Sequence, residues 1–498
     1  MLSWKEDITR RKNSRRKKKR DERRADGTCT RGRRKEEGEM AALVPSWLAC
    51  VRRTQQHVFK RIKHNLASTS PCGRRTLSTS CSHSHGDSED GQGGGGGGGG
   101  GGGVESGSIV SEGWSDAKTF GLSEDQVEFK TVSDHFAANE LLPYAAKWDE
   151  EKHFPQDVLR QAAGLGFGGI YCSEEYGGSG LGRLDAAVIF EALAYGDVSF
   201  TAYLTIHNMN CYVLDTFGSK EQKEKYLSRM TSMELFSSYC LTEPNSGSDA
   251  ASLATIATRK GEDYVLNGSK AFISGGGVSD VYVVMARTGE PGPKGISCFL
   301  VEKDTEGVSF GKPEVKLGWN SQPTTVVSFD DVVVPRANRI GDEGVGFKIA
   351  MAGLDGGRIN IATCSVGGAQ FALDAAREYS SGRKQFGKEL SRFQNTQFKL
   401  ADMMTSLTAS RLMVRRAAMA LDAKIPSATA EAAMAKRFAT DTCFDVANQA
   451  LQLHGGYGYL RDYPVERVLR DLRVHSILEG TNEIMRVIIA REMDKQLI

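Results

Sequence analysis

Long apolar runs are missing from this chain of 498 residues. No stretch approaches the roughly 20 consecutive apolar residues that a membrane-spanning helix needs, so we expect no membrane insertion. Closely spaced cysteines are also missing: the ten cysteines are scattered, and none forms the Cys-x-x-Cys pair typical of zinc or redox sites. A body of this size does not depend on disulfides, so we expect reduced thiols and no bound metal.

Positive charge is in deficit over most of the chain, although the net charge is +2. Residues 116–498 carry a net charge of −8, and the excess of Lys and Arg is confined to residues 1–86. Nucleic-acid binding depends on neutralising phosphates with Lys and Arg, so the acidic body argues against a nucleic-acid partner. The basic run from Arg10 to Arg24 is open to a second reading as a nuclear-import patch. We favour a removable or disordered leader.

The first 86 residues divide into two segments of different composition. Residues 1–39 hold 16 Lys or Arg and 8 Asp or Glu, a mixture unlike a targeting signal. Residues 40–86 hold seven Lys or Arg and no acidic residue, with apolar residues at helical spacing, which is the composition of a mitochondrial transit peptide. Translation is therefore predicted to begin at Met40, with residues 1–39 a basic extension outside the native protein. An ordinary disordered tail is the alternative.

Residues 87–115 form a Gly-rich segment with five acidic residues and no Lys or Arg. Eleven consecutive glycines occupy residues 93–103, and such a run has no side chains to bury and a large entropy to lose on ordering. It matches the dinucleotide-binding pattern G-x-G-x-x-G only trivially, because the flanking strand and helix are not predicted. We interpret the segment as a flexible linker.

The remaining residues change from a helical pattern to a strand pattern and back. Residues 116–238 are predicted to be helical. Residues 239–345 contain β-branched runs separated by Gly and Pro turns, which predicts a sheet of hairpins. Residues 346–498 return to long amphipathic helices, of the kind that pack as a bundle. The predicted fold class is α+β, with an N-terminal helical domain, a middle β domain and a C-terminal helical bundle.

Two short motifs predict local structure within this body. Ser123 and Gln126 have the S-x-x-Q spacing of a capping box, which predicts the start of a helix. Asn267–Gly268 separates two β-rich runs, which predicts a hairpin turn at that dipeptide.

Six longer segments carry distinctive sequences. They are YCLTEPNSGSDAASL, NGSKAFIS, GGRINIA, RKQFG, QLHGGYGY and ILEGTNEIMR, at residues 239–253, 267–274, 356–362, 383–387, 452–459 and 477–486. Together, in this order and spacing, they resemble the acyl-CoA dehydrogenase family, and the resemblance extends over residues 116–498. The segments TIHNM (205–209), GWNSQPT (318–324) and ILEGTNEIMR are most similar to family members that act on short branched acyl chains.

The resemblance implies an FAD-dependent enzyme that removes two hydrogens from neighbouring carbons of an acyl-CoA. The implied substrate is isobutyryl-CoA, converted to methacrylyl-CoA in valine degradation, with 2-methylbutyryl-CoA and butyryl-CoA as alternatives. Electron transfer flavoprotein is the implied electron acceptor, a homotetramer the implied assembly, and the mitochondrial matrix the implied location. The sequence does not specify the acyl chain, because one methylene changes discrimination by only about 1–3 kcal/mol.

Glu479 is the predicted catalytic base. The resemblance implies that a base removes the α-proton while the β-hydrogen leaves as hydride, and Glu479 lies in a Leu-Glu-Gly-Thr-Asn-Glu turn before the final helix. An apolar acyl pocket would raise the pKa of this carboxyl toward neutrality. A lone Glu at a helix N-terminus more often interacts with the helix dipole, and the surrounding motif reverses that interpretation. Some family members place the base at the position matching Gly357, which offers no side chain.

The resemblance assigns FAD contacts to six stretches. Small residues, hydroxyls and backbone N–H groups suit the first stretch to a flavin edge and a pyrophosphate. The family commonly has Gly where Asn245 stands, and Asn tolerates the positive φ expected there. Phe272 would contact the flavin ring and Ser274 would bond near N5, although Phe272 alone resembles a core strand residue. The predicted residues are Tyr239, Cys240, Leu241, Thr242, Glu243, Pro244, Asn245, Ser246, Gly247, Ser248, Phe272, Ile273, Ser274, Arg383, Phe393, Gln394, Gln452, Leu453, His454, Gly455, Gly456, Thr481, Asn482 and Glu483.

Substrate contacts are implied on two helices and in the first FAD stretch. Arg358 suits the polar or phosphate groups of CoA, although an Arg on a helix is as often part of a surface ion pair. The predicted substrate-binding residues are Ser248, Asp355, Gly356, Gly357, Arg358 and Arg491. In the family, Arg383 and residues 452–456 contact FAD held by a neighbouring subunit, which implies an obligate dimer paired into a tetramer.

Two competing functions stay open at this level. An acyl-CoA oxidase would pass electrons from the reduced flavin to oxygen, but the chain length and a C-terminus unlike Ser-Lys-Leu favour the dehydrogenase. A non-catalytic assembly protein on the same fold is the second alternative. Retention of the whole predicted site, including Glu479, argues against it.

Overall fold

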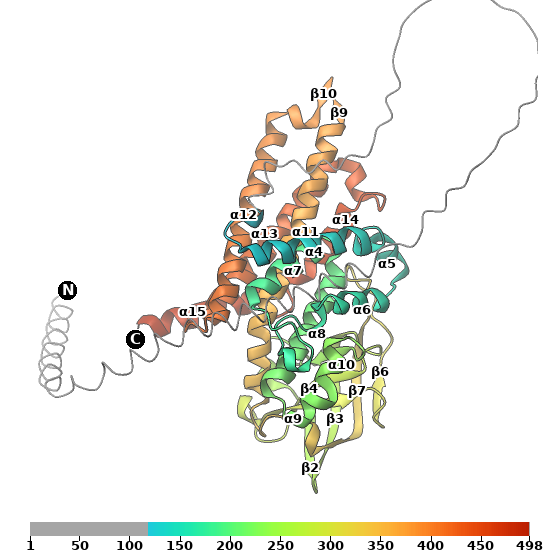
Figure 1. Cartoon of the computed structure of the whole chain (residues 1–498), viewed down its shortest axis with the longest axis vertical. Coiled ribbons are helices and arrows are strands. Elements are labelled where there is room, and N and C mark those ends of the chain that lie inside the picture. Colours follow the sequence, from blue (N-terminus) through green and yellow to red (C-terminus); the bar gives the residue numbers. More distant parts are fainter. Residues whose placement is uncertain (1–117, 498) are drawn as a thin grey trace, which may run out of the picture. The chain divides into compact units, whose positions relative to one another are not determined.

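The computed structural model describes residues 118–497 (Figure 1). All the described residues belong to one compact unit. The extension, transit peptide and linker predicted before residue 116 lie outside the described residues and stay predictions. Within residues 118–497, none of the helices combines the length and apolarity required to cross a membrane, and no cluster of His, Cys, Asp or Glu is placed to hold a metal ion.

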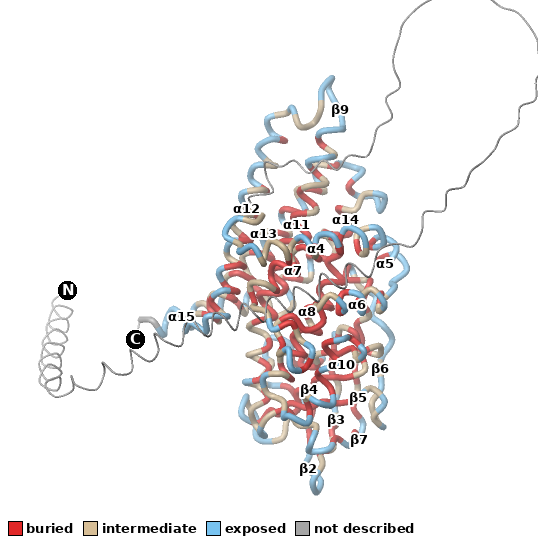
Figure 2. Tube along the Cα trace, viewed as in Figure 1, coloured by how far each residue is buried: buried red, intermediate tan, exposed pale blue. Residues whose placement is uncertain are grey.

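Helices form the first part of the described chain. They are α4 (Glu124–Phe136), the π-helical turn η2 (Ala137–Leu141), α5 (Ala145–Glu151), α6 (Gln156–Gly164), α7 (Arg183–Gly196), α8 (Val198–Phe217), α9 (Lys220–Gln222) and α10 (Ser228–Thr231). The predicted capping box at α4 is confirmed: the Ser123 hydroxyl accepts from the Gln126 N–H at 3.2 Å, and the Gln126 side chain accepts from the Ser123 N–H at 3.0 Å. α7 and α8 are buried over most of their surface and form the centre of this region (Figure 2).

A mainly antiparallel sheet of eight strands follows the helices. The strands are β1 (Ser237–Cys240), β2 (Ile256–Lys260), β3 (Asp263–Ser274), β4 (Val281–Arg287), β5 (Ile296–Glu302), β6 (Val308–Phe310), β7 (Thr324–Pro335) and β8 (Arg339–Ile340). Their order is β6-β7-β3-β2-β4-β5-β8, and β1 pairs in parallel with β4. β4 and β5 are buried on both faces, because Val283 packs toward Cys211 of α8 while Val284 packs toward Tyr264 of β3.

The hairpin predicted at Asn267–Gly268 is wrong. β3 runs through both residues without turning, and Asn267 exchanges two hydrogen bonds of 2.9 Å with Asp331 on the neighbouring β7. The pairing of β3 with β7 slips at this point, so the dipeptide marks a β-bulge. The hairpin that does form joins β2 to β3 through Gly261 and Glu262, where Gly261 has φ +66°.

Long helices form the last part of the chain. They are α11 (Gly346–Gly382), α12 (Gln394–Asp422), α13 (Ala428–His454), α14 (Val465–Leu472) and α15 (Asn482–Leu497), with the short strands β9 (Lys384–Gln385) and β10 (Lys388–Glu389) between α11 and α12. α11 packs against α12 and α13 and also against α7 and α8 (Figure 1). Side chains from the middle of α11 therefore lie where the N-terminal helices meet the bundle. The predicted α+β fold class is confirmed.

Candidate active site

The predicted base lies in a strained turn between the 3-10 turn η11 (Arg473–Ser476) and α15. Glu479 and Gly480 both have left-handed backbone conformations, with φ of 56° and 85°. Gly adopts this conformation freely, whereas Glu does so only when its surroundings hold it there. The Thr481 hydroxyl accepts the N–H of Ile484 at 3.3 Å and so caps the start of α15.

Lys436 of α13 holds this turn in place. Its ammonium group donates to the Gly480 carbonyl and to the Asn482 side chain, each at 2.8 Å. Asn482 in turn donates to Thr440 at 2.9 Å and to Asp441 at 2.6 Å. Three side chains of α13, including Lys436, therefore hold the turn and the start of α15. Lys436 is completely buried, and burial lowers its pKa to about 8 while Glu479 opposes that shift. Lys436 was not predicted, although a Lys in an alanine-rich helical stretch was an available signal.

The Glu479 carboxylate lies against Gly357 of α11. A Cβ added at Gly357 would lie 2.7 Å from Glu479 Cδ, so only glycine leaves room for the carboxylate. Glu479 keeps an intermediate exposure as a whole, but its Oε2 atom is buried and has no hydrogen-bond partner among the described residues. Burial raises the pKa of Glu479 to about 7, and the positive charges of Arg358 and Lys436 limit the rise. A buried carboxylate without donors is suited to accepting a proton.

Asp355 and Arg358 form an ion pair that flanks Gly357 on the same helix. The Arg358 guanidinium contacts Asp355 Oδ1 at 2.5 Å, and Asp355 Oδ2 accepts from Thr429 at 2.9 Å. Burial raises the pKa of Asp355, and Arg358 and Thr429 oppose the rise. Arg358 is 4% exposed, and its Nε has no partner among the described residues. The surface ion pair considered for Arg358 is therefore wrong.

A second buried arginine, Arg183 of α7, lies on the neighbouring side of α11. A Cβ added at Gly356 would lie 2.8 Å from Arg183 Cζ, so the glycine makes room for the guanidinium. The guanidinium also lies 3.7 Å from the ring centre of Tyr171 and 4.4 Å from that of Tyr212. The sequence offered no signal for this contact, because the four residues come from separate segments.

Tyr239 lies at the end of β1 with its hydroxyl near the base. The hydroxyl is buried and has no hydrogen-bond partner among the described residues. Burial raises the pKa of Tyr239 well above its ordinary value, and the charge of Glu479 contributes to the rise. Cys240 and Leu241 are buried behind it, and Thr242 accepts the Ala271 N–H at 2.8 Å. The predicted first FAD stretch is thus fixed to β3.

Glu243 is committed to a buried ion pair. Its carboxylate contacts the ammonium of Lys270 at 2.7 Å and accepts the backbone N–H groups of Ala254 and Thr255 at 2.6 and 2.9 Å. Lys270 is 0% exposed and Glu243 is 5% exposed. Lys270 holds the pKa of Glu243 below its ordinary value despite burial. The Glu243 side chain therefore fixes the loop and is not free to reach a flavin.

The loop after Glu243 turns tightly through Pro244 and Asn245. The N–H of Ser246 donates to the Glu243 carbonyl at 3.1 Å, and the reverse bond is 2.9 Å long. The expectation that Asn245 has a positive φ is wrong: neither Asn245 nor Gly247 is left-handed, so this turn does not require that conformation. Gly247 and Ser248 follow and are exposed.

Phe272 interrupts β3 with a second irregularity. It has φ 58° and is 71% exposed, and the pairing of β3 with β7 slips between Lys270 and Ile273. The reading of Phe272 as a core strand residue is wrong: Ile273 takes the core position and is 2% exposed. The Ser274 carbonyl accepts from the Ser238 hydroxyl at 2.6 Å. The bulge therefore presents a large aromatic ring outward in a conformation that costs energy.

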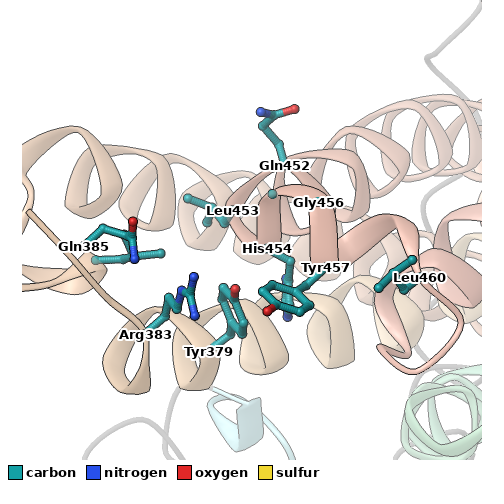
Figure 3. A pocket seen from close by; sticks show the side chains of 11 residues that line it. Tyr379, Arg383, Gln385, Gln452, Leu453, His454, Gly456, Tyr457 and Leu460 are labelled. Atoms are coloured by element: carbon teal, nitrogen blue, oxygen red, sulfur yellow. The ribbon is translucent and has the colours of Figure 1, made fainter.

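A pocket of about 400 Å³ lies at the far end of α11 (Figure 3). It brings together the predicted residues Arg383 and Gln452 to Gly456, with Tyr379, Tyr457 and Leu460 beside them. His454 is buried, bonds the Ala450 carbonyl at 2.8 Å and stacks on Tyr379 with ring centres 4.4 Å apart. Both contacts hold the His454 ring at the end of α13.

The pocket and Glu479 are far apart within one chain. Gly357 and Gly382 lie 25 residues apart on one helix, which corresponds to about 38 Å. One bound dinucleotide in a single chain would not contact both Glu479 and Arg383. Phe393 and Gln394 lie at the start of α12, and Glu483 and Arg491 are exposed on α15. None of these four lines the pocket.

Family models match most of the described chain. The N-terminal, middle and C-terminal domains of acyl-CoA dehydrogenase match residues 123–234, 238–332 and 344–493. Solved structures with the same fold include butyryl-CoA dehydrogenase from Megasphaera elsdenii, with 39% identity, TM-score 0.73, and coverage of 75% of this chain and 99% of that chain. A structure titled for the electron transferring flavoprotein of Acidaminococcus fermentans has 41% identity and TM-score 0.73 at the same coverage.

Curated relatives are more similar in sequence. Mitochondrial isobutyryl-CoA dehydrogenase of Dictyostelium discoideum is 61% identical over 376 residues, covering 75% of this chain and 90% of the relative. The Bos taurus protein of the same name is 59% identical over 375 residues, with the same coverage. The matches include all three family domains, and Glu479 lies in the C-terminal one. The chain belongs to the acyl-CoA dehydrogenase family.

Proposed function

We propose that this protein dehydrogenates isobutyryl-CoA to methacrylyl-CoA, with Glu479 as the base that takes the α-proton. The observation that carries the proposal is the Glu479 carboxylate: it is held in a left-handed turn against Gly357, with Oε2 buried and unpaired among the described residues. The two relatives at about 60% identity, both named for this substrate, support isobutyryl-CoA.

The chain itself supplies positioning, basicity and exclusion of water. A thioester α-proton is a far weaker acid than a carboxyl, so the base must be oriented on the proton and kept from solvent. A pKa of about 7 leaves Glu479 partly ionised near neutral pH and makes it a stronger base than an exposed carboxylate. The backbone N–H of Glu479 would bond the thioester carbonyl, as a donor of an oxyanion hole does.

FAD is the cofactor of the family, and a related solved structure, PigA, contains it. Three features of the described residues fit FAD. The Tyr239 hydroxyl is buried without a hydrogen-bond partner, the Phe272 ring is exposed, and Arg383 lines a pocket. When bound, FAD accepts the β-hydrogen as hydride. Tyr239 to Ser248, without the Glu243 side chain, and Phe272 to Ser274 would hold the flavin half.

The distance between Glu479 and the Arg383 pocket supports an oligomer. Since one chain places them about 38 Å apart, Arg383 and residues 452–456 would contact the FAD of a neighbouring subunit. This would make the dimer the smallest unit with complete sites, and pairing of dimers would give the proposed homotetramer. Electron transfer flavoprotein is the proposed electron acceptor, consistent with the similar structure from Acidaminococcus fermentans.

The mitochondrial matrix is the proposed location, with the reaction placed in valine degradation. The relatives named as mitochondrial proteins support the mitochondrion, and the composition of residues 40–86 supports removal of a transit peptide. N-terminal sequencing of the mature protein tests this. A mature start before residue 40 would contradict both the transit peptide and the proposed start of translation at Met40.

The test of the proposed function is a panel of short acyl-CoA thioesters compared by kcat/KM. Isobutyryl-CoA should give the highest value, above 2-methylbutyryl-CoA and butyryl-CoA. Electron transfer flavoprotein should be reduced in the assay. Formation of peroxide without reduction of that flavoprotein would identify an oxidase. An FAD-loaded enzyme whose flavin is not bleached by any member of the panel would support a non-catalytic assembly protein.

A further inference from the structure

A compact apolar cluster lies next to the base and has no role in the account above. Its buried members are Ala194, Ala202, Trp319, Ile361 and Cys364. Leu478, which directly precedes Glu479, packs against this cluster. Trp319 is its largest side chain and is 6% exposed. The indole ring is therefore the bulkiest apolar group that packs in the same cluster as Leu478.

The cluster lies on the acyl side of the proposed site. Ile361 is four residues after Gly357 on α11, so both lie on one face of the helix, and Gly357 faces the Glu479 carboxylate. Asp355, a proposed CoA contact, lies two residues before Gly357, whereas Ile361 lies four residues after it, and Arg358 next to Gly357 bonds Asp355. If the CoA end lies toward Asp355 and Cα meets Glu479, the acyl chain points toward Ile361 and Trp319.

Hydrogen bonds fix Trp319 at both its backbone and its ring. The Trp319 N–H donates to Asp471 at 2.6 Å, and the indole N–H donates to His475 Nε2 at 3.2 Å. His475 Nδ1 bonds the Ser365 hydroxyl at 2.7 Å, and that hydroxyl also donates to the Ile361 carbonyl at 2.9 Å. Burial lowers the pKa of His475 to about 3, so its ring is neutral and Nε2 is able to accept.

The backbone at Trp319 is strained. Trp319 has φ 55°, a left-handed conformation that a bulky side chain adopts only when its surroundings impose it. The neighbours impose it: a Cβ added at Gly318 would lie 2.5 Å from the Arg470 carbonyl, and Asn320 donates to Asp149 at 2.8 Å. A ring held in this way is a fixed wall, because rotating it would break the indole hydrogen bond to His475.

We infer that Trp319 limits the length of the acyl chain that this enzyme accepts, because its ring closes the acyl pocket beyond the reacting carbons. The inference rests on the proposed function and adds a specificity-determining residue to it. A rigid wall admits a short branched chain and rejects a longer linear one. It discriminates by overlap with atoms that cannot move, so removing part of the ring should relax the discrimination.

The test compares FAD-loaded, full-length wild type with Trp319→Phe, using isobutyryl-CoA and hexanoyl-CoA. The ratio of kcat/KM for isobutyryl-CoA to that for hexanoyl-CoA should fall at least about ten-fold, the smallest effect expected of one methylene. Trp148→Phe is the matched control, because Trp148 is also 6% exposed and lies outside the cluster. Its ratio should stay within about two-fold of wild type.

Each outcome decides the inference separately from the proposed function. A wild type active on isobutyryl-CoA with an unchanged ratio in Trp319→Phe would overturn the inference alone. A wild type inactive on every acyl-CoA would overturn the proposed function. If Trp319→Phe does not fold, a crystal structure of wild type with bound product decides: indole atoms within about 4 Å of the acyl terminus support the inference. An acyl terminus in contact with other residues only would overturn it.

Discussion

The kcat/KM of this enzyme should rise about ten-fold from about pH 6 to about pH 8. Burial raises the pKa of Glu479 from 4.5 to about 7. A carboxyl with this pKa is about one-tenth ionised at the lower pH and about nine-tenths ionised at the higher pH. An ordinary Glu is almost fully ionised at both values, so its rate would not change. Only the ionised form takes the α-proton, and the rate follows its fraction.

The assay measures kcat/KM with isobutyryl-CoA well below its KM, because this quantity reports the ionisation of the free enzyme. Flavin absorbance at each pH serves as the control for loss of FAD. The rise should level off above about pH 8, where ionisation is nearly complete. A profile that is flat between about pH 6 and pH 8, with FAD retained, would show that Glu479 ionises like an exposed carboxyl. That result would refute the argument from burial.

Three substitutions test the contacts around the base and the loop. Gly357→Ala should lower turnover about 100-fold or more with FAD retained, because the added Cβ displaces the Glu479 carboxylate. Gly382→Ala is the control and should keep wild-type turnover, because the space around its Cβ is open. Equal turnover in the two variants would contradict the packing of Glu479 against Gly357. Lys436→Met should move the pH profile to higher pH, because it removes a charge that lowers the pKa of Glu479; an unmoved profile would contradict this. Lys270→Met should destabilise the protein by about 3–5 kcal/mol, because it leaves a buried carboxylate unpaired; an unchanged melting temperature would show that the pair is dispensable.

Much of the fold follows from local sequence periodicity. The runs 281–286, 296–301 and 325–334 form strands, and long amphipathic segments form α12 and α13. These predictions succeed because burial of one face imposes a period on each element. The order of helices, sheet and helices then restricts the architecture, and the six motifs identify the family.

Local signals failed where a neighbouring strand decided the conformation. Asn267–Gly268 has turn chemistry, but Asp331 on β7 bonds the Asn side chain and converts the expected hairpin into a bulge. Phe272 has the apolar side chain of a core position, but the slip between β3 and β7 turns it outward. Neither partner is near in sequence, so no window of residues contains the information.

For the base, the sequence predicted a raised pKa but not the residues that surround the carboxyl. A motif placed Glu479 in its turn, but burial against Gly357 raises the pKa of the carboxyl and Lys436 limits that rise, and these two residues are 122 and 43 residues away along the chain. The dependence of the site on a second subunit was implied by resemblance only. The distance along α11 between Gly357, beside Glu479, and the Arg383 pocket is a physical argument for the same dependence.

Flavin bleaching by isobutyryl-CoA in the absence of oxygen tests the role of Glu479 most directly. Wild type and Glu479→Gln are loaded with FAD and mixed with substrate in a stopped-flow spectrophotometer. The amide keeps the shape of the side chain but does not take a proton, so bleaching should slow by about 100-fold to 10,000-fold while FAD stays bound. A variant that bleaches within about ten-fold of the wild-type rate would show that another group removes the α-proton.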